Sequence, residues 1–326
     1  MLLLGAAAMP DLLDVVALGE TMVLFLAQQA GPLREASTFS RHIAGAESNV
    51  AVGMCRLGRS AGFISRLGDD EFGRVILSRL RGEGVDVSQV IFDPGAPTGL
   101  VIRERREVGP VDVLYYRRGS AASRLSPADL NASYVAAARY LVLSGITPAL
   151  SSSCRETVFA AAEIARAARV TVVVDPNVRL KLWSAEDARA TIRDLVGHAD
   201  LVLPGLEEAQ LLTGESDAGL AARALLELGP RMVVVKLGER GALALTTEGL
   251  VEAPAEKLTR IVDPVGAGDA FAAGFLAGQA RGMDLTAALA LANRCGAAAM
   301  LVPADQEGLP RWEEVAGPAF VGDVRR

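Results

Sequence analysis

The sequence has few histidines and cysteines, and both shortages narrow the chemistry available to it. His42 and His198 are the only histidines among 326 residues, which argues against a histidine-based catalytic metal site. The three cysteines, Cys55, Cys154 and Cys295, lie far apart and form no C-x-x-C pair. This spacing argues against a disulfide framework and against a zinc site. We therefore expect a protein of the reducing cytoplasm.

Long apolar runs and an excess of positive charge are also missing. No apolar run reaches 18 residues, so we expect no membrane-spanning helix and no membrane partner. The 33 basic residues are outnumbered by 39 acidic residues, for a net charge of -6. No broad basic face is available for a nucleic-acid backbone, so nucleic acid is not an expected partner.

The N-terminal segment is apolar but does not read as a secretory signal. MLLLGAAAMP carries no positive charge before its apolar run, and the strand-like DVVALG begins at Asp14 without a cleavage spacer. We expect residues 1–13 to form a disordered extension, with Met9 as a candidate native start. Residues 14–326 are then expected to form a single domain.

The remaining chain alternates short β-branched runs with helical stretches rich in alanine and leucine. Helices are expected around 152–168, 185–197 and 218–228. The strands at 171–174 and 232–235 are apolar along their whole length, as buried strands with helices on both faces must be. This order predicts an α/β fold with a central, mostly parallel sheet and helices on both faces.

One stretch interrupts the alternation. Residues 97–120 contain two alternating strands around a charged turn with a Gly-Pro pair, which predicts an antiparallel hairpin. Together with residues 21–43 it is expected to form a small antiparallel β lid. One face of such a sheet has no helix to cover it, so it must bury that face on a ligand, on the main domain or on another subunit. We therefore expect a lid, a homo-oligomer contact, or both.

Residues 263–271, DPVGAGDAF, combine small residues, an acid and the start of an apolar helix. The free N–H groups of the first helical turn and the positive end of the helix dipole would stabilise an anion there. Asp269 in that turn could accept a proton from a hydroxyl nucleophile. The pattern suits attack of an alcohol on a phosphate. A glycine-assisted helix start with a dipole-friendly aspartate explains the same residues without any ligand.

Other nucleotide and hydrolase motifs are absent or misplaced. No Gly-Lys pair exists for a phosphate-binding loop of the Walker type, and Phe271 occupies the third small position of a dinucleotide-binding pattern. GRSAG at 58–62 matches a hydrolase nucleophile elbow around Ser60, but here a helix precedes a strand, which is the reverse of the required order. A serine hydrolase remains an alternative that the order of elements opposes.

Two stretches resemble the paired signatures of one family. AGAESNVAVGMCRLG at 44–58 and DPVGAGDAFAAGF at 263–275 resemble those of the ribokinase-like carbohydrate kinases of the phosphofructokinase B type. The resemblance extends from Asp14 to about Arg311. LYYRRGSAASRLSP and LSGITPALS look most like the 2-keto-3-deoxygluconate kinases of that family.

The resemblance implies an enzyme that uses ATP and Mg²⁺ to phosphorylate the terminal hydroxyl of a sugar acid. The alternatives are a fructokinase, a ribokinase, a 2-keto-3-deoxygalactonate kinase, or a non-catalytic sugar-binding protein of the same fold. By resemblance, Asp269 is the general base, and the N–H groups of Gly266, Ala267 and Gly268 form the hole for charge on the transferring phosphoryl group.

The same resemblance assigns residues to the sugar. They are Gly45, Asn49, Tyr115, Arg117, Arg179 and, more weakly, Asp305. A 2-keto acid carries a carboxylate, which a planar guanidinium can hold through two charge-assisted hydrogen bonds. Alternatively, YYRR is an alternating strand whose arginines point into water.

For the nucleotide, the resemblance implies contacts from Lys236, Gly238, Gly241 and Asn293, together with Gly266 and Gly268. Glu208 is expected to hold Mg²⁺, through water or directly. Gly205 stands where the family usually has an asparagine, so Glu208 would organise the metal and its waters alone.

Overall fold

The computed structural model describes residues 12–106 and 111–317. Most of the expected N-terminal extension lies outside these residues, as do the charged turn at 107–110 and the tail at 318–326. Leu13 already belongs to the first strand, one residue earlier than expected. Among the described residues, no helix is both long and apolar enough to span a membrane.

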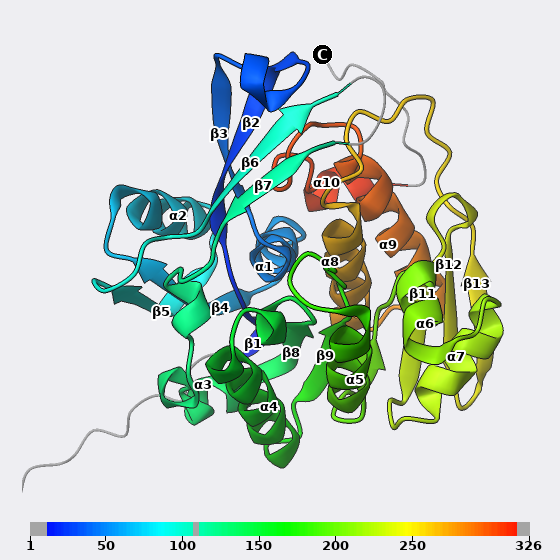
Figure 1. Cartoon of the computed structure of the whole chain (residues 1–326). Coiled ribbons are helices and arrows are strands. Elements are labelled where there is room, and N and C mark those ends of the chain that lie inside the picture. Colours follow the sequence, from blue (N-terminus) through cyan, green and yellow to red (C-terminus); the bar gives the residue numbers. More distant parts are fainter. Residues whose placement is uncertain (1–11, 107–110, 318–326) are drawn as a thin grey trace, which may run out of the picture.

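The larger sheet forms the centre of the molecule (Figure 1). In the described part of the chain it has nine strands in the order β13-β12-β11-β10-β9-β8-β1-β4-β5. Their bounds are β1 Leu13–Leu18, β4 Ala61–Gly68, β5 Asp86–Asp93, β8 Ala138–Ser144, β9 Thr171–Asp175, β10 Leu201–Val202, β11 Met232–Lys236, β12 Ala242–Thr246 and β13 Gly249–Ala253. The pairs from β5 to β11 are parallel. Only β12 and β13 run antiparallel, so the predicted mostly parallel sheet is confirmed.

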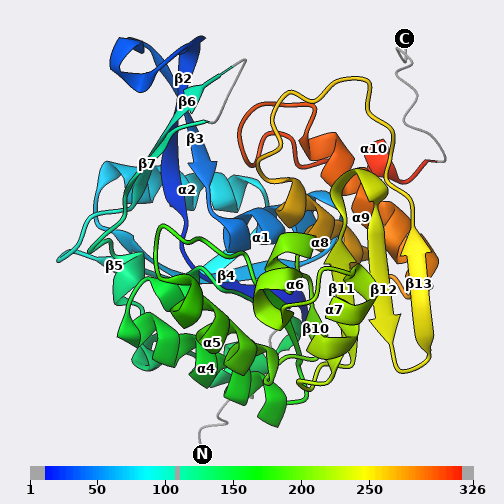
Figure 2. The ribbon, with the colours of Figure 1, turned by 45° about the vertical axis from the view of Figure 1, so that its right-hand side comes forward.

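Helices cover both faces of this sheet (Figures 1 and 2). Val15 and Ala17 of β1 pack in one apolar cluster, whereas Val16 and Leu18 pack in another. The first cluster includes α1 Ala46–Arg56, α2 Glu71–Gly82, α8 Ala267–Ala280, α9 Leu285–Ala299 and α10 Trp312–Val315. The second includes α3 Ala132–Ala136, α4 Ser152–Ala167, α5 Ala185–Val196, α6 Leu206–Thr213 and α7 Ala218–Leu226. Alternate side chains of one strand thus serve opposite layers.

The three predicted helices are present as α4, α5 and α7, each within two residues of the expected bounds. Each begins at a side-chain cap: Ser151, Ser184 and Asp217 accept a hydrogen bond from a first-turn N–H group. Such caps satisfy donors that have no partner inside the helix, and for this reason the starts were predictable.

A second, small sheet stands off the main body (Figures 1 and 2). Its strand order is β3-β2-β6-β7, with β2 Met22–Ala30, β3 Phe39–Ala44, β6 Leu100–Arg105 and β7 Val113–Tyr116. The predicted hairpin is confirmed as the antiparallel pair β6–β7, and β2–β3 is also antiparallel. The central pair β2–β6 is parallel, because two separate hairpins join side by side.

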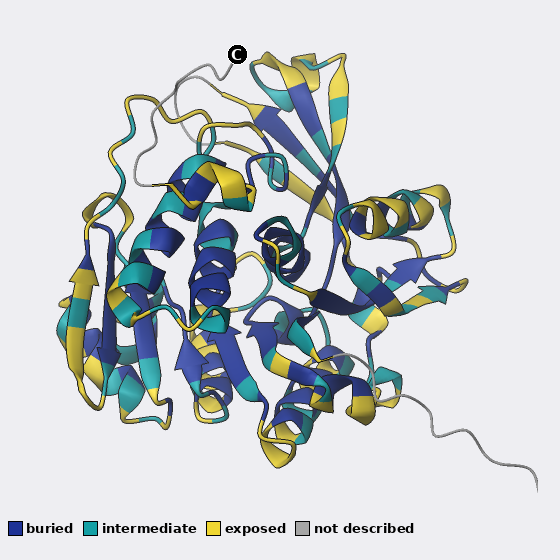
Figure 3. Ribbon diagram, turned by 180° about the vertical axis from the view of Figure 1, so that it is seen from behind, coloured by how far each residue is buried: buried dark blue, intermediate teal, exposed yellow. Residues whose placement is uncertain are grey.

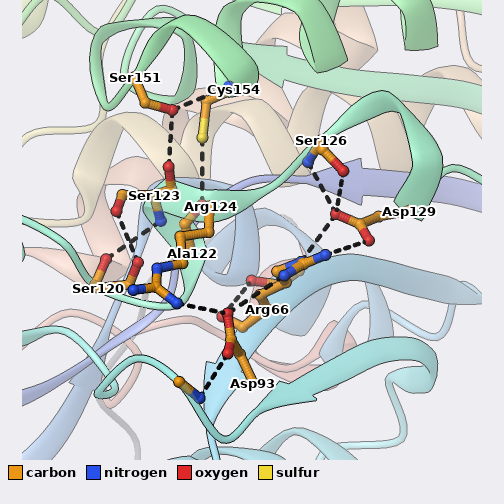
Figure 4. Close-up of polar contacts among 12 residues, drawn as sticks. Arg66, Asp93, Ser120, Ala122, Ser123, Arg124, Ser126, Asp129, Ser151 and Cys154 are labelled. Atoms are coloured by element: carbon orange, nitrogen blue, oxygen red, sulfur yellow. Dashed lines mark hydrogen bonds and ion pairs between the residues drawn. The ribbon is translucent and has the colours of Figure 1, made fainter.

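The segment that leads from β7 back to the main sheet is fixed by polar contacts (Figure 4). Arg66 of β4 donates to Asp129 at 2.7 Å and 2.9 Å and to Asp93 at 3.3 Å. At the start of α4, Ser151 Oγ donates to the carbonyl oxygen of Ser123 at 2.7 Å. The small sheet is therefore connected to the main body through a well-anchored segment.

Helix α8 runs through the interior, as the buried colour in Figure 3 shows. Its residues from Ala270 to Gly278 are all buried. A Cβ atom on Gly274 would lie 2.8 Å from the sulfur of Cys295 in α9, so glycine allows the two helices to approach closely. This packing fixes the position of the first turn of α8.

Candidate active site

A cavity of about 950 Å³ separates the small sheet from the main sheet. Its floor consists of residues at or just after the carboxyl ends of parallel strands, namely Glu20, Ile146, Asp175, Gly205 and Lys236. Its roof consists of alternate residues of the small sheet, namely Met22, Leu24, Val101, Arg103, Val113 and Tyr115. Ligands of open α/β sheets bind at this end of the strands.

The structure brings most of the predicted site residues together. The cavity is lined by Gly45, Tyr115, Arg117, Arg179, Glu208, Lys236, Gly238, Gly266, Gly268, Asp269 and Asp305. Asn49, Gly241, Ala267 and Asn293 are not part of this lining. Residues from both ends of the chain therefore meet at one cavity, as the two signatures predict.

The turn before α8 has the geometry of an anion site. Gly266 caps the helix in a left-handed conformation with φ of 83°, and a Cβ atom there would lie 2.8 Å from the carbonyl oxygen of Asp305. Only glycine fits this position without strain. Within the described residues, the N–H groups of Gly268 and Asp269 have no backbone acceptor. The turn thus offers free donors at the positive end of a helix dipole.

Asp269 lies beside this turn and contacts the other signature. Asn49 Nδ2 of α1 donates to Asp269 Oδ2 at 2.8 Å. Burial raises the pKa of Asp269 to about 7; the Asn49 hydrogen bond and Lys236 oppose the rise, while Asp175 and Asp305 add to it. Asn49, predicted as a sugar contact, therefore holds the carboxylate of Asp269 in place.

Lys236 forms an ion pair that the sequence did not reveal. Its Nζ lies 2.7 Å from Asp175 Oδ2, and a Cβ atom on Gly268 would lie 3.6 Å from the same nitrogen. Burial lowers the pKa of Lys236, but Asp175 and Glu208 outweigh that effect and raise it overall. Lys236 is therefore a charged group next to the start of α8. Asp175 ends a buried strand in DPNVR, a position that could have marked it as a site residue.

Glu208 uses both carboxylate oxygens on backbone groups. Oε1 accepts from the N–H of Val178, and Oε2 accepts from the N–H of Gly205, each at 2.8 Å. Among the described residues, no three His, Cys, Asp or Glu side chains are grouped to hold a metal ion. A Mg²⁺ ion near Glu208 would therefore take most of its ligands from phosphate oxygens and water.

The two predicted arginines differ in their surroundings. Arg117 is buried and pairs with Glu20, whose Oε1 also accepts from Ser120 Oγ at 2.8 Å. The alternative that its guanidinium points into water is wrong for Arg117. Arg179 is exposed at the cavity, and within the described residues its side chain donates one hydrogen bond, to the carbonyl oxygen of Val178 at 3.1 Å. In the described structure, Arg179 is thus the arginine whose charge is available to a ligand.

The structure gives Asn293, predicted as a nucleotide contact, and Ser60 of the hydrolase motif specific local partners. Asn293 Nδ2 donates to the carbonyl oxygens of Ala253 and Pro254 at 3.1 Å and 2.9 Å. Ser60 Oγ accepts from the N–H of Asp14 at 2.9 Å and lies between α1 and β4. This confirms the helix-to-strand order that opposes a nucleophile elbow.

The sequence matches carbohydrate kinases over most of its length. The family model described as "pfkB family carbohydrate kinase" matches residues 12–312. The 2-dehydro-3-deoxygluconokinase of Bacillus subtilis (strain 168) is 42% identical over 308 residues, which cover 93% of this chain and 94% of the relative. The 2-dehydro-3-deoxygluconokinase of Thermoproteus tenax is 39% identical over 307 residues, with 93% of each chain covered.

The fold is also similar to a solved structure with bound nucleotide. This is a putative ribokinase II from E. coli in complex with ATP and Mg²⁺, with a TM-score of 0.87 and 27% identity. The similarity covers 94% of this chain and 98% of that chain. Both the small sheet and the turn before α8 fall inside the matched range 12–312.

Proposed function

The chain belongs to the pfkB family of carbohydrate kinases, and from this we propose that it transfers the terminal phosphoryl group of ATP to 2-keto-3-deoxygluconate. The acceptor would be the terminal hydroxyl of this sugar acid, also named 2-dehydro-3-deoxygluconate, and the product its 6-phosphate. Two relatives that carry the name of this kinase support the choice of substrate. The observation that carries the proposal is the carboxylate of Asp269 beside the free amides of the α8 turn.

In this mechanism Asp269 accepts the proton of the attacking hydroxyl. Asn49 keeps the accepting carboxylate in position through its 2.8 Å hydrogen bond. The N–H groups of Gly266, Gly268 and Asp269 stabilise negative charge that develops on the transferring phosphoryl group. The N–H group of Ala267, which was expected to take part, donates to the carbonyl oxygen of Pro264 at 3.4 Å instead. Their position at the N-terminus of α8 adds the field of the helix dipole.

The remaining cavity residues fit a nucleoside triphosphate with Mg²⁺. Lys236 is charged and adjacent to Gly268, so it would neutralise phosphate oxygens. The absence of a side chain at Gly268, next to Lys236, leaves room for a phosphate against the backbone. Glu208 would orient water ligands of Mg²⁺, and the ion would neutralise negative charge on the phosphates.

The free guanidinium of Arg179, which also lines the cavity, would bind the substrate carboxylate. Gly45, Tyr115 and Asp305 also line this cavity and would contact the sugar. Because Arg117 is neutralised by Glu20, we assign it to the hydroxyl groups of the sugar. An uncharged sugar would leave Arg179 without a partner, and this favours an acid.

The test is a coupled assay of ADP release with 2-keto-3-deoxygluconate, 2-keto-3-deoxygalactonate, fructose and ribose. We expect kcat/KM to be highest for 2-keto-3-deoxygluconate. Equal kcat/KM values for fructose and the keto acid would contradict the acid-sugar proposal. A non-catalytic sugar-binding protein would bind the keto acid in calorimetry but release no ADP.

The proposal includes a homo-oligomer formed through the small sheet. Tyr115 faces the cavity, so its neighbours Leu114 and Tyr116 point to the other face, where they are 46% and 60% exposed. An apolar patch of this kind is suited to contact with a second subunit.

The proposal also places the protein in the cytoplasm, where ATP is available and Cys55 stays reduced.

A further inference from the structure

A buried arginine connects the small sheet to the turn before α8. Arg103 of β6 is 5% exposed, and its Nη2 lies 2.5 Å from Asp263 Oδ2. Its Nη1 lies 3.5 Å from Asp263 Oδ1 and 3.7 Å from Asp305 Oδ1. One guanidinium thus joins a strand of the roof to two acids from two other segments of the chain.

Asp263 holds the beginning of the turn. Its Oδ1 accepts from the N–H of Val265 at 3.1 Å, and its Oδ2 accepts from the N–H of Ala304 at 3.1 Å. Ala304 itself packs in the apolar cluster beneath the small sheet. The carboxylate of Asp263 therefore fixes the residues that lead into Gly266, with Arg103 as its counter-charge.

Asp305 supports the same turn from below. The site of a Cβ atom on Gly266 is 2.8 Å from the carbonyl oxygen of Asp305 and 3.4 Å from its Cα. With so little space between them, a shift of Asp305 must move Gly266 as well. The guanidinium of Arg103 also contacts the side chain of Asp305. It therefore supports the turn through both Asp263 and Asp305.

We infer that Arg103 is a positioning residue that couples the position of the small sheet on the main body to the geometry of the anion-binding turn at Gly266–Gly268. The inference rests on the proposed function in that this turn binds the transferring phosphoryl group. Arg103 lines the cavity, but its guanidinium is engaged by Asp263 and Asp305. We therefore assign it a role that acts through these two acids and not through contact with the substrate.

The charges around Arg103 agree with this role. Burial raises the pKa of Asp305 to about 6. Arg103 and a hydrogen bond from Asn49 oppose the rise, whereas the negative charges of Asp263 and Glu307 add to it. Removal of Arg103 would leave two neighbouring carboxylates without their shared counter-charge. Repulsion between Asp263 and Asp305 would then open the loop beneath Gly266.

The test compares the wild-type protein with Arg103→Met, Arg103→Lys and the control Arg105→Met. Arg105 lies on the same strand but is exposed, and it forms no ion pair within the described residues. Steady-state assays give kcat and the KM values for ATP and the keto acid. Hydrogen exchange of residues 263–268 and 301–305 gives a readout that does not depend on activity.

In Arg103→Met we expect kcat to fall about 10- to 100-fold, because a displacement near 1 Å has that effect on a reacting geometry. The KM for ATP should change less than about threefold, since the turn acts mainly in the transition state. Any rise in the KM for the keto acid, which Asp305 would contact, should be smaller than the fall in kcat. Arg103→Lys should recover part of kcat, because it keeps the charge but loses the two-armed contact. Exchange in the two segments should quicken in Arg103→Met and stay unchanged in Arg105→Met.

Several results would overturn the inference. Folded Arg103→Met with wild-type kcat would do so, as would a higher sugar KM at unchanged kcat, which would show that Arg103 only holds the small sheet. Equal defects in the Met and Lys variants would exclude the ionic basis. If Arg103→Met does not fold, Arg103→Lys decides. A wild-type kcat and a wild-type rate of hydrogen exchange in Arg103→Lys would contradict the coupling. A wild-type protein inactive on the keto acid would refute the proposed function alone, because the exchange data would still test the coupling.

Discussion

At the residue scale, Asp269 is the group on which the proposed mechanism depends. We expect Asp269→Asn to lower kcat by about 10²- to 10⁴-fold, the usual contribution of a general base. Its circular dichroism spectrum should be the same as that of the wild-type protein. The base works only as a carboxylate, and its pKa is raised to about 7. The kcat/KM of the wild-type protein should therefore rise as pH increases through about 7. A flat profile from pH 5 to 8 would be inconsistent with this base.

Arg179 gives a second prediction at this scale, on substrate choice. Loss of one charge-assisted contact with a carboxylate should raise the KM for 2-keto-3-deoxygluconate about 10- to 100-fold in Arg179→Met. Any activity on fructose should change little, because fructose has no carboxylate. Arg118→Met serves as the control, since Arg118 is exposed and does not line the cavity. Equal losses on both sugars would indicate that Arg179 has a structural role instead.

Which residues could be predicted depends on how far apart the partners lie in sequence. Gly266, Gly268 and Asp269 stand within one short motif, so a single stretch revealed them. Lys236 and Asp175 are 61 residues apart, and Arg103 and Asp263 are 160 residues apart. Such pairs form only after the strands are ordered in space, and no local pattern encodes that order. For the same reason the hydrogen bond from Asn49 to Asp269, which are 220 residues apart, was not predicted.

At the scale of elements, the turn before α8 yields the sharpest prediction. Gly266→Ala places a side chain on a residue with positive φ, and this strain should lower the free energy of unfolding by about 1 to 3 kcal/mol. The new Cβ atom would also collide with the carbonyl oxygen of Asp305. We expect both lower stability and a large loss of kcat. Gly282→Ala is a matched control, because Gly282 also has positive φ, at 72°, but a Cβ atom there meets nothing within 4 Å. It should lose some stability and retain kcat; equal kcat in the two variants would contradict the anion-site geometry.

Among the elements, those with strong local signals were predictable. The helices α4, α5 and α7 combine apolar periodicity with side-chain caps. The edge hairpin β12–β13 was not predicted, because two short antiparallel strands there replace the alternation of strand and helix. The parallel pair β2–β6 in the small sheet also escaped prediction. It depends on two hairpins meeting in space, and neither hairpin's sequence specifies its neighbour.

At the scale of the whole molecule, the small sheet predicts an assembly. Leu114→Asp places a charge on its exposed face, away from the cavity. If this face joins two subunits, light scattering should give the mass of an oligomer for the wild-type protein and of a 34.0 kDa monomer for the variant. Burial of an unpaired charge at an apolar contact would cause that dissociation. A monomeric wild-type protein would refute the proposed contact.

The most direct measurement is a crystal structure of the protein with a non-hydrolysable ATP analogue, Mg²⁺ and 2-keto-3-deoxygluconate. We expect the terminal phosphate oxygens to lie about 3 Å from the amide nitrogens of the turn at Gly266–Gly268. The terminal hydroxyl of the sugar should donate to Asp269 and face the terminal phosphorus. A terminal phosphate bound elsewhere, with Asp269 out of reach of the hydroxyl, would contradict the mechanism.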